Sequence, residues 1–218
     1  MGKIYLFTPE QKIIFDQIST SKYIRSNFYF TGGTALSYYY LHHRYSEDLD
    51  FFSEDKLDTQ ALLLLMQEWS HTYNFSFTQV FREVVYIFNL VFENGSELKV
   101  DFGHYPHRRV RPELSYQGLA IDSLLDIAIN KLLTVNQRTK VKDFVDLYFL
   151  LKEFTLWDLI EGQRVKFRVK TDPFILSGDF LKVESFTEMP RMIKPLTLIQ
   201  LQTYFRKLAV SLGKKAVI

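Results

Sequence analysis

Cysteine is absent from this chain of 218 residues, which excludes disulfides, thiolate nucleophiles and cysteine-based zinc sites. Long hydrophobic runs are also missing. The longest, residues 61–66, is far shorter than the roughly 20 apolar residues that a membrane-spanning helix needs. The N-terminus has no apolar segment of signal-peptide form. We therefore expect a cytoplasmic protein without a membrane-embedded part.

A strong excess of either charge is also lacking, since the formal net charge is +2, but the charges are unevenly distributed. Residues 1–160 contain 16 basic and 20 acidic side chains, whereas residues 161–218 contain 11 basic and 5 acidic ones. Such a basic region occurs on surfaces that bind a polyanion such as RNA, and more often on amphipathic helices with surface lysines. Composition alone leaves both interpretations open.

The order of patterns along the chain predicts a mixed α/β core followed by helices. Strand patterns occur at residues 28–31, 48–52, 75–82, 84–92 and 97–102. Helical patterns occur at residues 8–25, 34–42, 59–72, 121–135, 140–154, 156–161 and 196–212. We expect an α+β fold with a mixed sheet and two domains, residues 1–118 and residues 119–218.

The most informative segment is residues 31–52, TGGTALSYYYLHHRYSEDLDFF. Asp48 and Asp50 lie two positions apart in an apolar strand pattern, so their side chains point to the same face. Two neighbouring carboxylates repel each other, and a divalent cation between them offsets that repulsion. Mg²⁺ prefers oxygen ligands of this kind. The pair therefore predicts a metal site.

A glycine turn precedes the two aspartates. Gly32 and Gly33 separate the predicted strand from a helix that we expect Thr34 to cap. Glycine lets the backbone approach a ligand closely, and free amides at the start of a helix bind phosphate oxygens. Alone, such a pair is more often only a tight turn, and an Asp-x-Asp is often a solvated strand end. Their combination at this spacing predicts a phosphate site beside the metal site.

Later segments carry residues that fit the same chemistry. Asp101 ends an apolar strand and is either an ordinary strand-terminal residue or a third metal ligand that also acts as general base. Lys131 interrupts the apolar stripe of a predicted helix, and Asp143 and Asp146 share one face of the next helix. Either aspartate could instead hold a nearby cation in place. The basic segment 104–111 fits a phosphate clamp or a solvated loop.

These motifs resemble those of the AbiEii/AbiGii-type nucleotidyltransferase toxins, a family of the polymerase-β-like superfamily. The resemblance covers roughly residues 28–152 and is carried by Gly32-Gly33-Thr34-Ala35-Leu36, His43-Arg44, Ser46-x-Asp48-Leu49-Asp50-Phe51, Lys131, Arg138 and Asp143-x-x-Asp146-Leu147. The sequence departs from the family at Lys142, where an arginine is common. Lysine cannot form the bidentate hydrogen bonds that arginine forms with a carboxylate, which affects the local ion-pair geometry.

The resemblance implies a polymerase-β-like core and a metal-dependent transfer of a nucleotide from an NTP to a hydroxyl group of tRNA or protein. It also implies Mg²⁺ or Mn²⁺ as cofactor and a separately encoded antitoxin. The implied metal ligands are Asp48, Asp50 and Asp101. The implied catalytic residues are these three with Lys131, Asp143 and Asp146. The implied nucleotide-binding residues are Gly32, Gly33, Thr34, Arg44, Ser46, Lys131 and Arg138.

Two other functions are compatible with the same motifs. A catalytically idle module that binds nucleotide or RNA would be expected to have lost carboxylates, whereas Asp48, Asp50 and Asp101 are all present. A small-molecule nucleotidyltransferase of the antibiotic-modifying type would need an acidic pocket for a cationic acceptor. The basic segment 104–111 and the basic C-terminal region favour a polyanion instead.

Overall fold

The computed structural model describes residues 6–112 and 114–216, which form two compact units. The first unit comprises Met1–Tyr40, Ser46–Arg108 and Pro112–Ser123. The second comprises Leu41–Tyr45, Arg109–Arg111 and Leu124–Ile218. Each unit has its own buried core.

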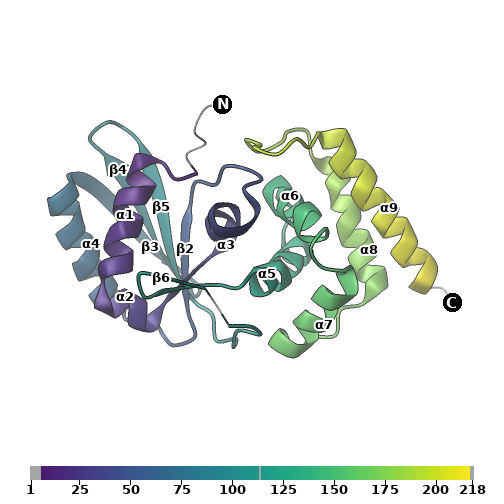
Figure 1. Cartoon of the computed structure of the whole chain (residues 1–218), viewed down its shortest axis with the longest axis horizontal. Helices are drawn as coiled ribbons and strands as arrows, with labels where there is room; N and C mark the ends of the chain where they lie inside the picture. Colours follow the sequence, from purple (N-terminus) through teal and green to yellow (C-terminus); the bar gives the residue numbers. More distant parts are fainter. Residues whose placement is uncertain (1–5, 113, 217–218) are drawn as a thin grey trace. The chain divides into compact units, whose positions relative to one another are not determined.

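The first unit is built on a seven-stranded mixed sheet with the strand order β3-β4-β5-β2-β1-β7-β6 (Figure 1). Strand β2 pairs with β5 in parallel, as does β1 with β7, and the other neighbours are antiparallel. The strands are β1 Tyr29–Thr31, β2 Leu49–Ser53, β3 Phe75–Arg82, β4 Val85–Phe92, β5 Glu97–His104, β6 Leu114–Tyr116 and β7 Leu119–Ile121. The predicted α+β fold class with a mixed sheet is confirmed.

Helices accompany this sheet in the same unit. They are α1 Pro9–Thr20, α2 Lys22–Asn27, α3 Gly32–Ala35, which continues into the π-helical η1 Leu36–Leu41, and α4 Thr59–Tyr73. The single helix predicted over residues 8–25 is wrong in one respect. Ser21 has an extended backbone, which ends α1, and its hydroxyl then caps α2 by accepting the amide of Ile24.

Phenylalanine side chains on one face of the central strands form the core of this unit. Phe30, Phe51 and Phe102 are neighbours in register across β1, β2 and β5, and all three are buried. Phe15 of α1 packs on Phe30, with the ring centroids 4.9 Å apart. Because side chains alternate along a strand, residues one position away on β2 and β5 point to the opposite face. The aromatic core thereby fixes the face on which polar residues of these strands lie.

The second unit is helical in its described part. Its helices are α5 Leu124–Gln137, α6 Val141–Leu150, α7 Leu156–Phe167, α8 Pro173–Leu181, the short 3₁₀ helix η2 Lys182–Ser185 and α9 Leu198–Ala216. Helix α5 packs against α6, α7 and α8, and α8 packs against α9. Phe205 of α9 contacts Phe144 of α6 and Phe180 of α8, with centroid distances of 5.0 and 5.3 Å. These buried rings join three helices into one core.

Helix α8 was not predicted from the sequence. Pro173 and Gly178 indicated a broken segment, yet Pro173 occupies the first helical turn, where its missing N–H leaves no bond unmade. The carboxylate of Asp172 caps the helix by accepting the amide of Phe174 at 2.7 Å. The short strands β6 and β7 were also not predicted from the sequence.

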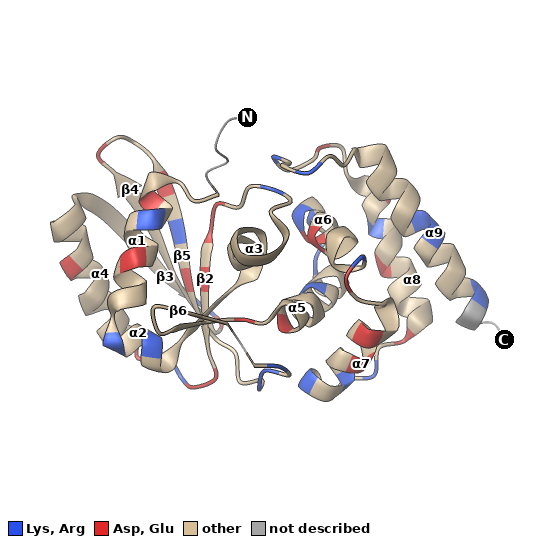
Figure 2. Ribbon diagram, viewed as in Figure 1, with Lys and Arg blue, Asp and Glu red and all other residues tan. Residues whose placement is uncertain are grey.

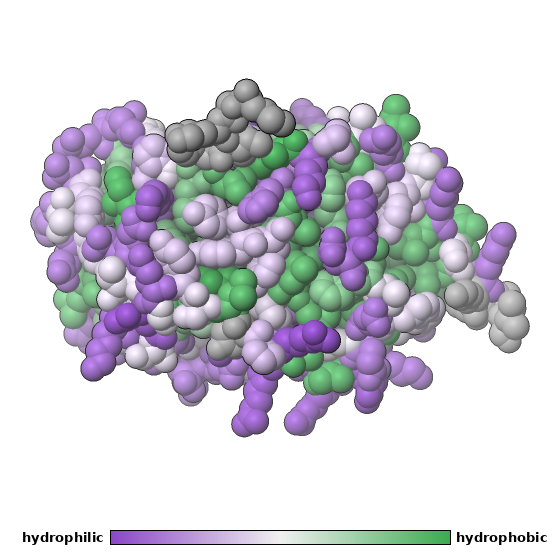
Figure 3. Space-filling model, viewed as in Figure 1, coloured by the Kyte–Doolittle hydropathy of each residue, from purple (hydrophilic) through white to green (hydrophobic). Residues whose placement is uncertain are grey.

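None of the helices in residues 6–112 and 114–216 combines the length and the apolar character that crossing a bilayer requires. On the face seen in the space-filling view, hydrophilic side chains project outward and apolar side chains are visible between them (Figure 3). Several large apolar side chains are exposed, among them Leu64, Phe81 and Ile199. Some exposure of apolar side chains is ordinary for globular proteins.

Candidate functional site

Asp50 and Asp101, two of the three predicted metal ligands, lie on neighbouring strands of the first unit, where Asp50 of β2 is in register with Asp101 of β5. Asp48 directly precedes the first residue of β2, and its charge acts on Lys99 of β5 together with the charge of Asp50. Paired residues on parallel strands point to the same face of the sheet. We call these four residues the carboxylate face. Figure 2 shows acidic and basic positions along β2 and β5.

Lys99 is a member of this face that sequence analysis missed. Its ammonium group forms an ion pair with the Asp101 carboxylate, and the two side chains are 36% and 13% exposed. Burial lowers the pKa of Lys99, but the hydrogen bond and charge of Asp101, together with the charges of Asp48 and Asp50, raise it above its usual value. The alternation Lys99-x-Asp101 was a signal that the two side chains share a face.

The glycine turn lies directly against Asp50. Gly32 has a φ of +77°, a conformation that residues with a side chain rarely adopt. A Cβ atom at this position would lie 2.1 Å from Oδ2 of Asp50, well inside contact distance. Glycine at position 32 is therefore required both by the backbone conformation and by the close approach of the carboxylate.

Thr34 does not cap the helix, and this prediction is wrong. The backbone stays extended through Thr31, so α3 begins at Gly32, and Thr31 precedes the helix without a side-chain cap. The Thr34 hydroxyl instead donates a hydrogen bond to the backbone carbonyl of Asp48, and Thr34 is buried. Thr34 thus ties the glycine turn to the first aspartate. Its contact with a nucleotide stays a prediction.

Gln11 of α1 holds the segment that leads to Asp48. Its Nε2 donates to the carbonyl oxygens of Ser46 and Glu47, both at 2.9 Å, and the residue is buried. Its Oε1 accepts the amide of Thr8 at 2.9 Å and closes a capping box at the start of α1. The sequence indicates the cap but not this second role. A nucleotide contact by Ser46 stays a prediction.

The other predicted site residues form a buried ion-pair network in the second unit. Arg44 donates from Nε and Nη2 to the two oxygens of Asp146, at 2.6 and 2.8 Å. Nζ of Lys131 lies 2.6 Å from Asp146 and 2.9 Å from Asp143. Nε of Arg138 lies 2.8 Å from Asp143. Both aspartates are fully buried, so the network satisfies charges that water cannot reach.

The charges in this network stabilise one another. Burial would raise the pKa of Asp146, but Arg44 and Lys131 hold it well below its usual value. Burial likewise opposes ionisation of Asp143, and Lys131 with Arg138 outweighs it and lowers that pKa. The pKa of Lys131 is raised, because Asp146 and Asp143 outweigh its burial. In this structure both aspartates hold cations in place, and contact of Lys131, Arg138 or Arg44 with a nucleotide stays a prediction.

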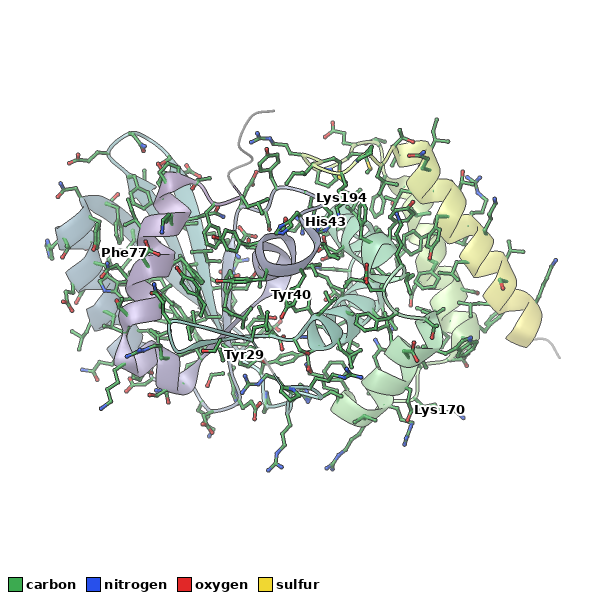
Figure 4. The ribbon with its side chains drawn as sticks, viewed as in Figure 1. Tyr29, Tyr40, His43, Phe77, Lys170 and Lys194 are labelled. Carbon is green, nitrogen blue, oxygen red and sulfur yellow. The ribbon has the colours of Figure 1, made fainter. Side chains whose placement is uncertain are left out.

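His43 belongs to the same network. Its Nε2 lies 2.7 Å from Oδ1 of Asp146, and its buried Nδ1 has no hydrogen-bond partner among the described residues. Burial outweighs the attraction of Asp146 and lowers the pKa of His43, so the ring is neutral. The His43 carbonyl accepts the amides of Ile193 at 2.9 Å and Lys194 at 3.0 Å. His43 and Lys194 are labelled in Figure 4.

The basic segment 104–111 is anchored at its end within the second unit. The buried carboxylate of Asp126 accepts the amides of Val110 and Arg111, at 2.9 and 3.0 Å. It also pairs with Nζ of Lys166 at 2.7 Å, and neither side chain is exposed. The Arg111 side chain itself is exposed. No local sequence pattern indicates a role for Asp126 or Lys166, because this pair joins residues 40 positions apart.

Within the two described stretches of the chain, no three or more His, Asp or Glu side chains are gathered into a group that could hold a metal ion. The donor atoms of Asp48, Asp50 and Asp101 nevertheless suit Mg²⁺, which takes carboxylate oxygens as ligands. The Lys99 ammonium, paired with Asp101, shows that a cation is stable on this face. The residues therefore fit a divalent cation in their chemistry.

Comparison with known families decides the family of the chain. The family described as nucleotidyl transferase AbiEii toxin of type IV toxin–antitoxin systems matches residues 14–200. The chain belongs to the AbiEii family. This AbiEii chain is also 30% identical, over 147 residues, to the uncharacterised protein aq_aa25 of Aquifex aeolicus (strain VF5). That alignment covers 65% of this chain and 66% of the relative, just under two thirds of its length.

Solved structures share the fold of this AbiEii chain. A candidate nucleotidyltransferase from H. pylori has a TM-score of 0.58 at 20% identity, covering 97% of this chain and 98% of that one. JHP933 from Helicobacter pylori has a TM-score of 0.56 at 20% identity, with 94% and 90% covered. The MenT4 nucleotidyltransferase toxin of Mycobacterium tuberculosis H37Rv has a TM-score of 0.52 at 16% identity, with 92% and 82% covered. At these identities the likeness is one of fold.

The buried network predicts a large difference between two single substitutions. Asp146→Ala leaves Arg44 and Lys131 buried without their shared counter-charge, so the free energy of unfolding should fall by about 3–5 kcal/mol. Arg138→Ala removes a side chain that is 52% exposed, and the loss should be at most about 1 kcal/mol. Urea denaturation of both variants measures the difference. Equal losses would contradict a buried network centred on Asp146.

The neutral, buried His43 predicts a loss of stability in mild acid. Its pKa in the folded protein lies below its unfolded value of about 6.5. The unfolded chain therefore takes up the proton first as the pH falls. The stabilisation is fully present above the unfolded pKa of about 6.5, and it is lost progressively as the pH falls from that value towards the lower pKa of the folded protein. In His43→Gln, which keeps an N–H donor for Asp146 but does not titrate, the free energy of unfolding should fall less between about pH 7.5 and 5.5.

The control for this pH effect is His71→Gln, since His71 is exposed on α4. Denaturation midpoints of wild type and both variants are measured across the same pH range. His71→Gln should follow the wild type. An unchanged pH dependence in His43→Gln would show that His43 is not the group responsible.

Proposed function

We propose that this AbiEii chain transfers a nucleoside monophosphate from an NTP to a hydroxyl group on tRNA or protein. The observation that supports this most directly is the register of Asp50 with Asp101 across β2 and β5, with Gly32 packed against Asp50. Adjacent carboxylates beside a glycine turn are suited to a cation and a phosphate chain held close together. The match to the AbiEii family supports the same reaction class.

The proposed reaction is a displacement at the α-phosphorus of the NTP. The acceptor oxygen forms a bond to that phosphorus, while the bond from the phosphorus to the oxygen bridging to the β-phosphate breaks. Pyrophosphate leaves with the electron pair of the broken bond, and the acceptor hydroxyl gives its proton to the carboxylate of Asp101. Mg²⁺ or Mn²⁺, held by Asp48, Asp50 and Asp101, would neutralise phosphate charge when bound.

Contacts inside each unit support positioning roles for residues near the aspartates. In the first unit, Thr34 and Gln11 bond to backbone carbonyls of residues 46–48. In the second unit, His43 and Arg44 bond to Asp146. Within the first unit, the contacts of Thr34 and Gln11 fix the path of the backbone that carries the first carboxylate. We propose that they align the aspartates and do not themselves touch the reacting atoms.

As part of the same proposal, the chain acts in the cytoplasm as the toxin of a type IV toxin–antitoxin system, restrained by a separately encoded antitoxin. Membership in the AbiEii toxin family supports this role. The exposed Arg111 and the basic C-terminal region support an anionic acceptor such as tRNA.

The proposal predicts that transfer depends on Asp50 and not on its exposed neighbour Glu47. Purified protein is incubated with Mg²⁺, each NTP labelled at the α-phosphate, and either total RNA or total protein. Wild type and Glu47→Ala should label one acceptor fraction, and Asp50→Ala should reduce the rate roughly 100-fold or more, since charge neutralisation at phosphate contributes several kcal/mol. Glu47 is a matched control because it is acidic, exposed and three positions away. Equal labelling by Asp50→Ala would contradict the proposal, as would no labelling by any protein.

A further inference from the structure

We propose that Lys99 is the internal counter-ion of the carboxylate face, and that a divalent cation must compete with its ammonium group for Asp101. The inference rests on the proposed function, because it concerns the metal site of that reaction. The direct ion pair between Lys99 and Asp101 carries it.

The geometry of β5 places the Lys99 side chain on the same face of the sheet as the Asp101 carboxylate. Lys99 and Asp101 are two residues apart on one strand, so their side chains lie on the same face. Asp50 is in register with Asp101 on the adjacent parallel strand. The charges of Asp48 and Asp50 act on Lys99 as well as that of Asp101, so three carboxylates surround this one ammonium group.

The charges on the carboxylate face explain why a divalent cation and the Lys99 ammonium group would compete for the Asp101 carboxylate. Three carboxylates and one ammonium group carry a net charge of −2, the amount that one divalent cation neutralises. Side chains on adjacent strands are separated by about the 4.8 Å strand spacing, so carboxylates there repel strongly. In the metal-free protein Lys99 offsets part of that repulsion. The Asp101 oxygen that accepts from Lys99 is engaged, so a metal ion gains it only when this ion pair is broken.

An ordinary surface ion pair in the same unit provides the comparison. Lys12 and Asp16 lie one turn apart on α1 and are 63% and 40% exposed. Such pairs contribute little, because water screens both charges. Lys99 and Asp101 are less exposed, at 36% and 13%, and two further carboxylates act on Lys99. Removal of the Lys99 charge should therefore change cation binding, whereas removal of the Lys12 charge should not.

The experiment measures Mn²⁺ binding in the absence of nucleotide, by electron paramagnetic resonance of free Mn²⁺. Lys99→Met should lower the dissociation constant about fivefold or more, because the competing charge is gone. Lys99→Arg keeps the charge and should stay near the wild-type value, as should Lys12→Met.

A second measurement is the melting temperature. Without metal, Lys99→Met should melt at a lower temperature than wild type, and saturating Mn²⁺ should raise the melting temperature of Lys99→Met by more than that of wild type. If Lys99→Met folds poorly, Lys99→Gln is measured in its place.

The outcomes separate this inference from the proposed function. Equal or weaker Mn²⁺ binding by Lys99→Met overturns the role of Lys99. If Asp48→Ala/Asp50→Ala also loses Mn²⁺ in that case, the metal site of the proposed function stands and only the inference about Lys99 falls. If the double variant binds Mn²⁺ as tightly as wild type, or if none of the proteins binds it, both the inference and the proposed metal site are wrong.

Discussion

Carboxylates on adjacent strands repel each other, and a cation beside them offsets that repulsion; this electrostatic constraint governs the first unit. The register of β2 with β5 brings Asp50 beside Asp101, and the buried aromatic core on the opposite face prevents either strand from turning its polar side inward. Gly32 permits the close approach of the turn, while Thr34 and Gln11 fix the backbone that leads to Asp50. Lys99 supplies the cation. Each of these features fixes the position or the charge balance of the two paired carboxylates, Asp50 and Asp101.

In the second unit, neighbouring carboxylates are neutralised by side-chain cations. There Asp143 and Asp146 contact three permanent cations, Arg44, Lys131 and Arg138, and both carboxylates are fully buried. Positive charge exceeds negative charge in that network, so it has no need of a metal ion. On the carboxylate face one ammonium group serves three carboxylates. This difference in charge balance, more than the presence of aspartates, distinguishes a candidate cation site from a structural network.

Patterns that repeat within one element could be predicted from the sequence, and contacts between distant elements could not. Alternation in an apolar strand predicts that Asp48 and Asp50 share one face; β2 begins at Leu49, so of these two only Asp50 lies within the strand. The two-residue spacing of Lys99 and Asp101 within β5 carried the same kind of information. The cap assigned to Thr34 was wrong because an extended Thr31 lets the helix start two residues earlier. The bonds from Arg44 to Asp146 join residues 102 positions apart, so no local pattern shows them. The resemblance to a family identified those residues without revealing that they contact each other.

Nucleotidyl transfer by this chain would break the bond between the α- and β-phosphates of an NTP. The most direct test treats the same acceptor fraction with purified protein and an NTP labelled either at the α-phosphate or at the γ-phosphate. Nucleotidyl transfer predicts that the α-label becomes attached to the acceptor and that the γ-label is released in pyrophosphate. Attachment of the γ-label would show phosphoryl transfer instead, and would contradict the account.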